Sequence, residues 1–467
     1  MNEKQKIILI MPYVGMEKRY GKGFNKIGSL LPPLGLLYIS SSLKNAGYDV
    51  ELIDMELKQL NDEYVIKKII NEGDNLVIGI YCNTSSKDNV IRLIKKIKEH
   101  TKSIVIVGGP HATVRPLELT PYADFVVIGE GEITIVELLN EINKEKPEYN
   151  KVKGIAYKNI ITEERPLINN LDELPFPDRE IINISDYRPS PNQYKQTPCT
   201  TMMCSRGCPY DCSFCQCKQL WTRKYRVRSV DNVMREIKKV YYDYKINDIS
   251  FFDDIWGINK EWVREFCDKM IQENMMITWS CDARINTVDQ ETLLLMKKAG
   301  CWAIFYGVES LDQDILNAIN KNVNVNSIMQ TLDWTKNAGI EIKANFMIGL
   351  PGSTPEKDKA TVKSICIINP DYVKFNIFTP YPDTEAYKQI VNGGWGDLTE
   401  DFSKCTHYFP TFKPSGYNSL KEVSDVRRYA HRKFFLRPRY IIKKILSIKS
   451  KEDIKRYFNG LRAIISI

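Results

Sequence analysis

Short apolar runs that end in polar or turn residues alternate with segments of helical periodicity through the first 140 residues. The runs typical of buried parallel strands are residues 6–12 (KIILIMP), 49–54 (DVELID), 76–81 (LVIGIY), 103–107 (SIVIV) and 125–128 (FVVI). Helices are predicted between them at residues 34–46, 63–71, 87–100 and 134–142. This alternation favours a parallel sheet with helices on both faces. We therefore predict a doubly wound, Rossmann-like α/β domain over residues 1–145.

The pattern changes between residues 146 and 197. Residues 154–158 (GIAYK) indicate a small hairpin, and residues 171–188 are rich in proline, aspartate and asparagine. Such composition is typical of a chain that turns repeatedly and forms little regular structure. We therefore predict a linker over residues 146–197.

The alternation resumes at residue 198 with a longer period. Strands are predicted at residues 199–204, 248–252, 277–283, 302–307, 341–348 and 371–378. Helices are predicted at residues 231–242, 260–274, 289–299, 312–319, 326–338 and 355–368. Six β/α units predict a full or partial barrel of the TIM type over residues 198–395, and the chemistry of such barrels lies at the C-terminal ends of the strands.

Composition changes this picture mainly at the C-terminus. The chain has 467 residues, of which 43% are hydrophobic and 27% charged, as expected for two or three globular domains. The net charge is +8, and residues 421–467 alone carry 14 Lys/Arg against 4 Asp/Glu, a net of +10. The basic character therefore belongs to a predicted helical region, residues 396–467, and gives no support for nucleic-acid binding by the core.

The expected location follows from what the sequence lacks. No apolar run approaches the roughly 20 residues that span a bilayer. The N-terminus shows no signal-peptide core or cleavage site. Twelve cysteines without a secretion signal indicate reduced thiols. We expect a cytoplasmic protein.

Three cysteines, Cys208, Cys212 and Cys215, stand in the run CPYDCSFC. Thiolates at this spacing can hold three irons of a 4Fe–4S cluster and leave the fourth iron open, whereas electron-transfer clusters normally have four cysteines. A zinc ribbon would need a second Cys-x-x-Cys pair or added histidines, and a disulfide framework belongs to short secreted chains. Chance clustering stays open because three further cysteines lie close by, but we favour the cluster.

The cysteine run follows the first strand of a predicted barrel, and Phe214 stands directly before its last cysteine. This arrangement resembles the signature of the radical S-adenosylmethionine superfamily. The resemblance implies a 4Fe–4S cluster whose open iron binds the amino and carboxylate groups of S-adenosylmethionine. An electron, from a donor such as a flavodoxin or ferredoxin, would cleave the sulfonium to a 5′-deoxyadenosyl radical. That radical would take hydrogen from an unactivated carbon while the barrel excludes water.

Further positions at the ends of predicted strands fit the same resemblance, which implies that they contact S-adenosylmethionine. They are Asp253, Asp254, Arg284, Glu309, Ser310 and Gly349, together with Phe214. An acid would bind the ribose, a glycine-rich backbone the adenine, and Arg284 the methionine carboxylate. Each position has another interpretation: the two aspartates could cap a helix, Glu309 could form a rim ion pair, and Gly349 could belong to a simple turn.

The N-terminal domain resembles the cobalamin-binding domain that precedes the barrel in one large branch of this superfamily. The matching pieces are PPLG (32–35), GGPHAT (108–113) and GEGE (129–132), where glycines let a bulky ligand approach the backbone. The resemblance assigns cobalamin contacts to Leu34, Gly35, Thr84, Ser85, Gly108, Gly109, His111, Ala112, Thr113, Gly129, Glu130, Gly131 and Glu132.

One departure concerns cobalt. The Asp-x-His-x-x-Gly motif that supplies a histidine ligand in other cobalamin proteins is missing, so the axial ligand is unassigned. We expect His111 to be a loop histidine that bonds the backbone and does not bind cobalt. A dinucleotide site is disfavoured because no Gly-x-Gly-x-x-Gly follows the first strand.

The leading functional hypothesis is a cobalamin-dependent radical enzyme, of the class B methyltransferase type, that methylates a carbon through methylcobalamin. Oxidative cyclisation or rearrangement is an alternative in the same superfamily, and a non-enzymatic cobalamin or iron–sulfur sensor or carrier is an alternative of another class. A methylthiotransferase is disfavoured because its N-terminal domain carries cysteines for a second cluster, and here that domain has only Cys82. We expect a small-molecule or lipid substrate, which the sequence does not identify.

The C-terminal region mixes basic and apolar residues, as in residues 427–447 (RRYAHRKFFLRPRYIIKKILS). Pro438 is predicted to break the helix. A basic amphipathic segment can lie on an anionic membrane, which would give the protein a peripheral position there. We favour the other interpretation, in which two helices pack on the barrel.

Overall fold

The computed structural model describes residues 5–20, 28–73, 76–190, 192–399, 401–448, 454, 457–458 and 461–462. The described residues form two compact units. The first is made of those in 1–15, 30–187 and 219–222, and the second of those in 16–29, 188–218 and 223–467.

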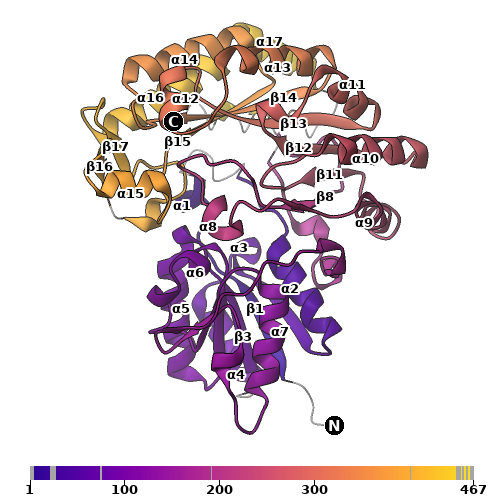
Figure 1. Cartoon of the computed structure of the whole chain (residues 1–467), viewed down its shortest axis with the longest axis vertical. Coiled ribbons are helices and arrows are strands. Elements are labelled where there is room, and N and C mark those ends of the chain that lie inside the picture. Colours follow the sequence, from indigo (N-terminus) through magenta and orange to yellow (C-terminus); the bar gives the residue numbers. More distant parts are fainter. Residues whose placement is uncertain are drawn as a thin grey trace. The chain divides into compact units, whose positions relative to one another are not determined.

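A parallel sheet forms the centre of the first unit (Figure 1). Its strands are β1 (Lys6–Met11), β2 (Asp49–Asp54), β3 (Leu76–Tyr81), β4 (Ile104–Gly108) and β5 (Phe125–Val127), in the order β2-β1-β3-β4-β5. The order reverses between β1 and β3. Ligands of such sheets bind beyond the carboxyl ends of the strands at this reversal.

Helices cover both faces of this sheet, as predicted. One apolar core lies under α4 (Asp62–Glu72), α5 (Lys87–His100) and the short α6 (Pro110–Val114), and the other under α2 (Leu34–Asn45) and α7 (Gly131–Ile142). The short α3 (Met55–Lys58) begins where the Asp54 side chain accepts a hydrogen bond from the Leu57 amide. Asn61 caps α4 in the same way.

The segment expected to be a linker belongs largely to the first unit. Strands β6 (Ile155–Tyr157) and β7 (Ile160–Ile161) form the expected hairpin, and β6 pairs antiparallel with β5. The hairpin thereby covers an otherwise open sheet edge. Farther along, Asp178 accepts a hydrogen bond from Ser40 Oγ at 2.6 Å, and Tyr187 donates to Asp54 at 3.0 Å. Local composition could not show that this segment belongs to the first unit, because the attachment depends on contacts with residues distant in sequence.

Six parallel strands form the sheet of the second unit. They are β8 (Cys199–Met202), β11 (Asp248–Phe251), β12 (Thr278–Ala283), β13 (Cys301–Glu309), β14 (Glu341–Ile348) and β15 (Tyr372–Ile377), ordered β15-β14-β13-β12-β11-β8. The two end strands do not pair with each other, so the barrel is partial. The predicted fold class is confirmed.

Helices follow the barrel strands and cover the outside of the sheet (Figure 1). They are α9 (Val230–Tyr242), α10 (Lys260–Glu273), α11 (Gln290–Lys298), α12 (Gln313–Ala318), α13 (Val325–Asn337) and α14 (Pro355–Ile368). The remaining elements are α1 (Met16–Tyr20), β9 (Ser205–Arg206), α8 (Cys217–Trp221), β10 (Arg226–Val227), α15 (Glu385–Val391), β16 (Gly396–Leu398), β17 (Phe412–Pro414), α16 (Leu420–Phe435) and α17 (Pro438–Leu446).

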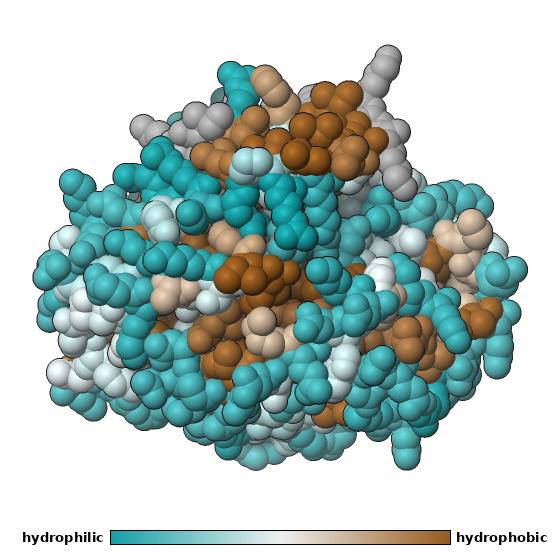
Figure 2. Space-filling view, turned by 90° about the horizontal axis from the view of Figure 1, so that it is seen from above, coloured by the Kyte–Doolittle hydropathy of each residue, from teal (hydrophilic) through white to brown (hydrophobic). Residues whose placement is uncertain are grey.

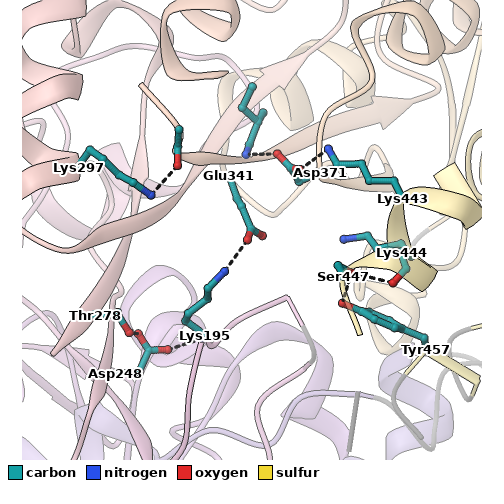
Figure 3. Close-up of polar contacts among 12 residues, drawn as sticks. Lys195, Asp248, Thr278, Lys297, Glu341, Asp371, Lys443, Lys444, Ser447 and Tyr457 are labelled. Carbon is teal, nitrogen blue, oxygen red and sulfur yellow. Dashed lines mark hydrogen bonds and ion pairs between the residues drawn. The ribbon is translucent and has the colours of Figure 1, made fainter. Parts of the chain in front are cut away.

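Charged side chains bridge the rim of the barrel where its strands begin, which we call the lower rim (Figure 3). The Lys195 amide donates to Asp248 at 2.6 Å, and the Lys195 ammonium bonds Glu341 at 2.8 Å. Next to Glu341, Lys443 of α17 bonds Asp371 at 2.5 Å. The chain before the barrel and the helix after it are thus both tied to the strand starts.

The C-terminal region breaks where the sequence predicts, because Pro438 is the first residue of α17 after α16 ends at Phe435. Val423, Val426, Ala430 and Phe434 of α16 are buried. Most of the predicted helical region beyond residue 448 lies outside the described residues. Within the described residues, the structure has no helix that is both long and apolar enough to span a membrane.

Candidate cluster and cofactor sites

The cysteine loop lies between β9 and α8, directly after the first barrel strand. Its start is fixed by the two predicted acids that follow β11. Asp253 Oδ1 accepts the amides of Cys204 and Ser205 at 2.9 and 2.5 Å, and Asp254 Oδ2 accepts the Gly207 amide at 2.9 Å. The structure therefore uses these carboxylates to shape the loop, and neither caps the next helix, which Asn259 caps.

The end of the cysteine loop is held by chain segments from elsewhere in the barrel. The Ser213 amide donates to the Ile319 carbonyl at 3.0 Å, and Asn320 Nδ2 donates to the Asp211 carbonyl at 2.8 Å. Phe214 packs among apolar side chains that include Leu350 and Phe378. Both ends of the loop are thus fixed before any cofactor binds.

Arg284 brings a buried positive charge to the cysteines. Its Nη1 donates to Cys212 Sγ at 3.3 Å, and its guanidinium stacks over the Tyr210 ring at 4.0 Å. Arg284 is only 6% exposed, and its Nε and Nη2 have no hydrogen-bond partner among the described residues. A buried guanidinium with unused donors is suited to a carboxylate.

The thiols differ in how readily they ionise. A hydrogen bond from Cys217 lowers the pKa of Cys208 to about 7, and the same kind of contact lowers the pKa of Cys215. Burial raises the pKa of Cys212. Thiolates are the form that binds iron. Two of the three cysteines are therefore prepared for ligation by their neighbour Cys217.

The donor set fits a cubane cluster better than a single ion. Within the part of the chain that the structure describes, no three His, Cys, Asp or Glu side chains converge on one metal position. A 4Fe–4S cluster distributes its three cysteine ligands over three irons, so they need not converge. The unused donors of Arg284 beside the loop provide for the carboxylate of a ligand at the open iron.

Glu309 lies in a buried polar network at the end of β13. Its two oxygens accept from Lys321 Nζ at 3.0 Å and Asn345 Nδ2 at 2.9 Å, and Asn376 donates to Asn345 at 2.8 Å. Glu309 is 4% exposed, so its ion pair with Lys321 is buried and does not lie on an exposed rim. Its backbone has a φ of 68°. The adjacent Ser310 is buried and accepts the Asp312 amide.

Gly349 begins the turn that follows β14, and it has a φ of 76°. Its amide donates to Asp358 Oδ2 at 2.9 Å, and Ser353 Oγ donates to the same oxygen at 3.0 Å. One carboxylate of α14 therefore holds both ends of the turn. Sequence reasoning did not identify Asp358.

The predicted cobalamin residues gather at the carboxyl edge of the first sheet. Thr84 and Ser85 follow β3, Gly108 ends β4, and Gly109 precedes α6 with a φ of 114°. His111 and Ala112 are buried, and the His111 ring lies 3.4 Å from Thr84 Oγ1 and 3.3 Å from Glu118. The imidazole therefore lies against side chains, Thr84 from the loop after β3 and Glu118 from the turn after α6, where we expected a bond to the backbone.

The loop after β5 is tied to its neighbour. The Gly129 amide donates to Thr113 Oγ1 at 3.0 Å, while Glu130 accepts the Ile168 amide at 2.7 Å and Glu132 is buried. Gly131 begins α7 against the Ile39 side chain, and Leu34 begins α2. At Gly35 and Gly129, no atom lies within 4 Å of where a Cβ would be, so open space adjoins this edge, as a bulky cofactor requires.

Two inward-facing Lys-x-Asn patterns escaped the sequence analysis. They are Lys343-Ala-Asn345 on β14 and Lys374-Phe-Asn376 on β15. Asn345 is the register partner of Lys374, so these two residues lie side by side on neighbouring strands. Polar residues at alternate positions of apolar strands were the available signal. Lys321 gave no such signal because its contact with Glu309 depends on the fold.

Comparison with known proteins places the chain in a family. Residues 202–365 match the family model for the radical SAM superfamily, and residues 23–139 match that for the B12 binding domain. An uncharacterized methyltransferase of Pyrococcus horikoshii is 33% identical over 444 residues, which cover 93% of this chain and 94% of that protein. An anaerobic magnesium-protoporphyrin IX monomethyl ester cyclase of Rubrivivax gelatinosus is 29% identical over 466 residues, covering 96% and 81%.

A solved structure supports the fold. The radical S-adenosylmethionine methyltransferase TsrM from Kitasatospora setae, with cobalamin and a 4Fe–4S cluster bound, has a TM-score of 0.71 at 14% identity, covering 93% of this chain and 90% of that one. The expected cofactors, a 4Fe–4S cluster, S-adenosylmethionine and cobalamin, agree with both family models. The chain belongs to the radical S-adenosylmethionine enzymes that carry a B12-binding domain ahead of the barrel.

Proposed function

We propose that this enzyme methylates an unactivated carbon of a small-molecule substrate. The observation that carries the proposal is the three-cysteine loop, which lies beside a buried arginine with unused donors in a chain that also has a B12-binding domain. When bound, the cluster and S-adenosylmethionine supply a hydrogen-abstracting radical, and cobalamin supplies the methyl group. The relative in Pyrococcus horikoshii, named a methyltransferase, supports the reaction type.

The chain's own residues take distinct parts in this proposal. Cys208, Cys212 and Cys215 hold the cluster, and Arg284 binds the methionine carboxylate. Lys321 and Asn345 hold Glu309 for the ribose. In the first unit, the loops after β3, β4 and β5 and the start of α2 hold cobalamin.

The barrel wall favours a polar substrate over a lipid. Asp282, Lys343 and Lys374 lie on the inner face of β12, β14 and β15, where the charges of both lysines act on Asp282. Ser250 and Ser280 also face each other there, with their hydroxyl oxygens 3.2 Å apart. An apolar chain would desolvate these charged and polar groups without offering them hydrogen bonds, which is costly.

The deciding experiment follows the two halves of S-adenosylmethionine. The reconstituted, reduced enzyme is given S-adenosylmethionine with a trideuterated methyl group, cobalamin and a polar extract of the source cells. Methyl transfer predicts 5′-deoxyadenosine and S-adenosylhomocysteine in similar amounts, and a product heavier by the labelled methyl group. Omitting cobalamin should stop product formation. Formation of 5′-deoxyadenosine with a modified product but no S-adenosylhomocysteine would reject methyl transfer.

A modified product formed with 5′-deoxyadenosine but without S-adenosylhomocysteine is the outcome expected of a second candidate function, cyclisation or rearrangement. The cyclase of Rubrivivax gelatinosus, similar over almost the whole chain, favours it as the alternative.

A non-enzymatic sensor is tested by Cys212→Ala, which should abolish cleavage of S-adenosylmethionine. Cleavage that persists in the reconstituted variant would show that the cluster assignment is wrong.

An electron donor such as a flavodoxin or ferredoxin is part of the proposal because the cluster must be reduced in each cycle. Reduced flavodoxin should replace dithionite as reductant in the cleavage assay. A reaction that proceeds only with dithionite would point to another donor.

We also propose a peripheral contact of α17 with an anionic membrane. Ile442, Ile445 and Leu446 are 56%, 59% and 79% exposed, whereas Lys443 pairs inward with Asp371 and Lys444 lies 3.6 Å from the centre of the Tyr372 ring. The helix therefore turns apolar residues outward. Figure 2 shows apolar patches among hydrophilic side chains on the face that includes α14, α16 and α17. The net charge of +10 in residues 421–467 suits anionic lipid.

Sedimentation with phosphatidylglycerol vesicles tests this contact. Binding should weaken in Leu446→Asp, in phosphatidylcholine vesicles and at high salt. Met276→Asp is the matched control, because Met276 is 80% exposed on the loop before β12. Equal binding of both variants would exclude α17 as the membrane contact.

A further inference from the structure

The carboxylate of Asp358 joins the turn after β14 to the C-terminal region. Besides Gly349 and Ser353, Asp358 Oδ2 accepts a hydrogen bond from the hydroxyl of Tyr417, which lies between β17 and α16. Asp358 is 3% exposed and Tyr417 is 2% exposed. The three donors on one buried oxygen therefore connect the turn to the C-terminal region without access to water.

The backbone around Tyr417 lies directly on the turn. A Cβ at Gly416 would stand 2.4 Å from the Ser353 carbonyl oxygen, so a glycine is required there. A Cβ at Gly349 would lie 3.1 Å from the Val423 side chain of α16. Both ends of the turn are therefore packed against residues 414–423.

This arrangement is more than general packing because a buried carboxylate is expensive to keep. Burial raises the pKa of Asp358 to about 6, so it is mostly ionised at pH 7 and depends on its three donors. Removing one donor from a buried carboxylate is locally destabilising, because water does not replace the lost hydrogen bond. The loss should disturb the geometry of the turn, because the Gly349 amide and the Ser353 hydroxyl are the remaining donors to Asp358.

We propose that Tyr417, through Asp358, positions the Gly349–Gly352 turn to bind the adenosine part of S-adenosylmethionine. The C-terminal region, which lies beyond the residues that match the radical SAM family model, is then part of the S-adenosylmethionine site. The inference rests on assigning this turn to adenosine and does not depend on whether the enzyme methylates. Tyr417 is a positioning residue in this scheme and does not touch the ligand.

The test compares Tyr417→Phe with Tyr440→Phe in the reconstituted, unreduced enzyme. Tyr440 is also a buried C-terminal tyrosine, but its hydroxyl lies 3.3 Å from the Asp371 carbonyl at the lower rim. Equilibrium binding is measured for S-adenosylmethionine and for methionine, which lacks adenosine. Tyr417→Phe should raise the Kd of S-adenosylmethionine about tenfold and leave that of methionine unchanged. Tyr440→Phe should change neither.

Other outcomes would overturn the inference. Equal weakening of both ligands by Tyr417→Phe would show a general loss of structure, and unchanged binding would show that the contact only stabilises the fold. Should Tyr417→Phe fail to fold, Ser353→Ala removes a second donor from the same carboxylate and carries the same expectation. Because no turnover is measured, failure of the proposed methyl transfer would leave these results interpretable.

Discussion

The second unit contains several buried ionisable side chains, and burial shifts the pKa of each. Burial raises the pKa of Asp282 to about 7 and lowers that of Lys343 to about 8. It also lowers the pKa of His407 to about 4 and that of His431 to about 3. At pH 7, Asp282 is therefore partly protonated and both histidines are neutral, while Lys343 is charged but loses its proton at a lower pH than an exposed lysine. Single substitutions at these positions should have measurable pH signatures.

His431→Gln should reduce the acid sensitivity of the second unit. In the folded protein the pKa of His431 is about 3, below its ordinary value of 6.5, so the folded state binds fewer protons than the unfolded state between these values. Its contribution to stability is present above pH 6.5 and is lost as the pH falls toward 3, by about 1.4 kcal/mol per pH unit. Urea unfolding from pH 7.5 to 4.5 should therefore show wild type losing stability relative to the variant. A constant difference would contradict the prediction.

Arg284→Met should separate ligand binding from cluster binding. The cysteines remain, so iron content should stay near wild type, whereas the lost guanidinium should weaken S-adenosylmethionine at least tenfold. Iron analysis and equilibrium binding measure the two effects. Arg264, an exposed arginine paired with Glu291, provides the control variant Arg264→Met. Loss of iron in Arg284→Met would instead assign Arg284 to the cluster.

At the scale of elements, regular structure was predictable where one face of a segment is buried. Strands β2, β3 and β14 and helix α5 have the bounds that the apolar pattern indicates. The attachment of β6 and β7 to the first sheet was not predictable, nor was the contact of Tyr417 with Asp358, because both depend on segments distant in sequence. The same limit applies to the site: the cysteines have a local signature, whereas Lys321 meets Glu309 only through the fold.

Two glycines of the first unit should respond differently to alanine. Gly109 has a φ of 114°, and a Cβ there would lie 2.8 Å from the Cys82 carbonyl oxygen, so Gly109→Ala should destabilise the fold by about 1–3 kcal/mol. Gly35 has an ordinary backbone and open space around it. Gly35→Ala should therefore keep stability but weaken hydroxocobalamin binding. Thermal unfolding and an absorbance titration distinguish the two, and unchanged cobalamin binding in Gly35→Ala would exclude that residue from the site.

At the scale of the molecule, two units with separate apolar cores should unfold separately. The cores of the first unit lie on the two faces of its sheet, and the second unit has its own core around Phe378 and Phe412. The division also explains why sequence predicted the fold class: each unit repeats one strand–helix pattern.

Urea unfolding of the full chain should therefore show two transitions. A ligand that binds one folded unit stabilises that unit alone, so hydroxocobalamin should shift only one transition. Gly109→Ala should move the same transition in the opposite direction. Tryptophan fluorescence reports mainly the second unit, because Trp256, Trp262, Trp279 and Trp302 are all buried there. A single transition shifted as a whole would contradict independent unfolding.

The bridged lower rim has a consequence for the order of events in turnover. Lys195 spans the strand starts and α17 is bonded to Asp371 beside it, so we expect molecules to enter and leave over the strand ends that carry the cysteine loop. Spent 5′-deoxyadenosine and methionine must then depart by the path that the next S-adenosylmethionine takes. Product release and substrate binding then share one route, so a slowly leaving product delays the binding of the next S-adenosylmethionine.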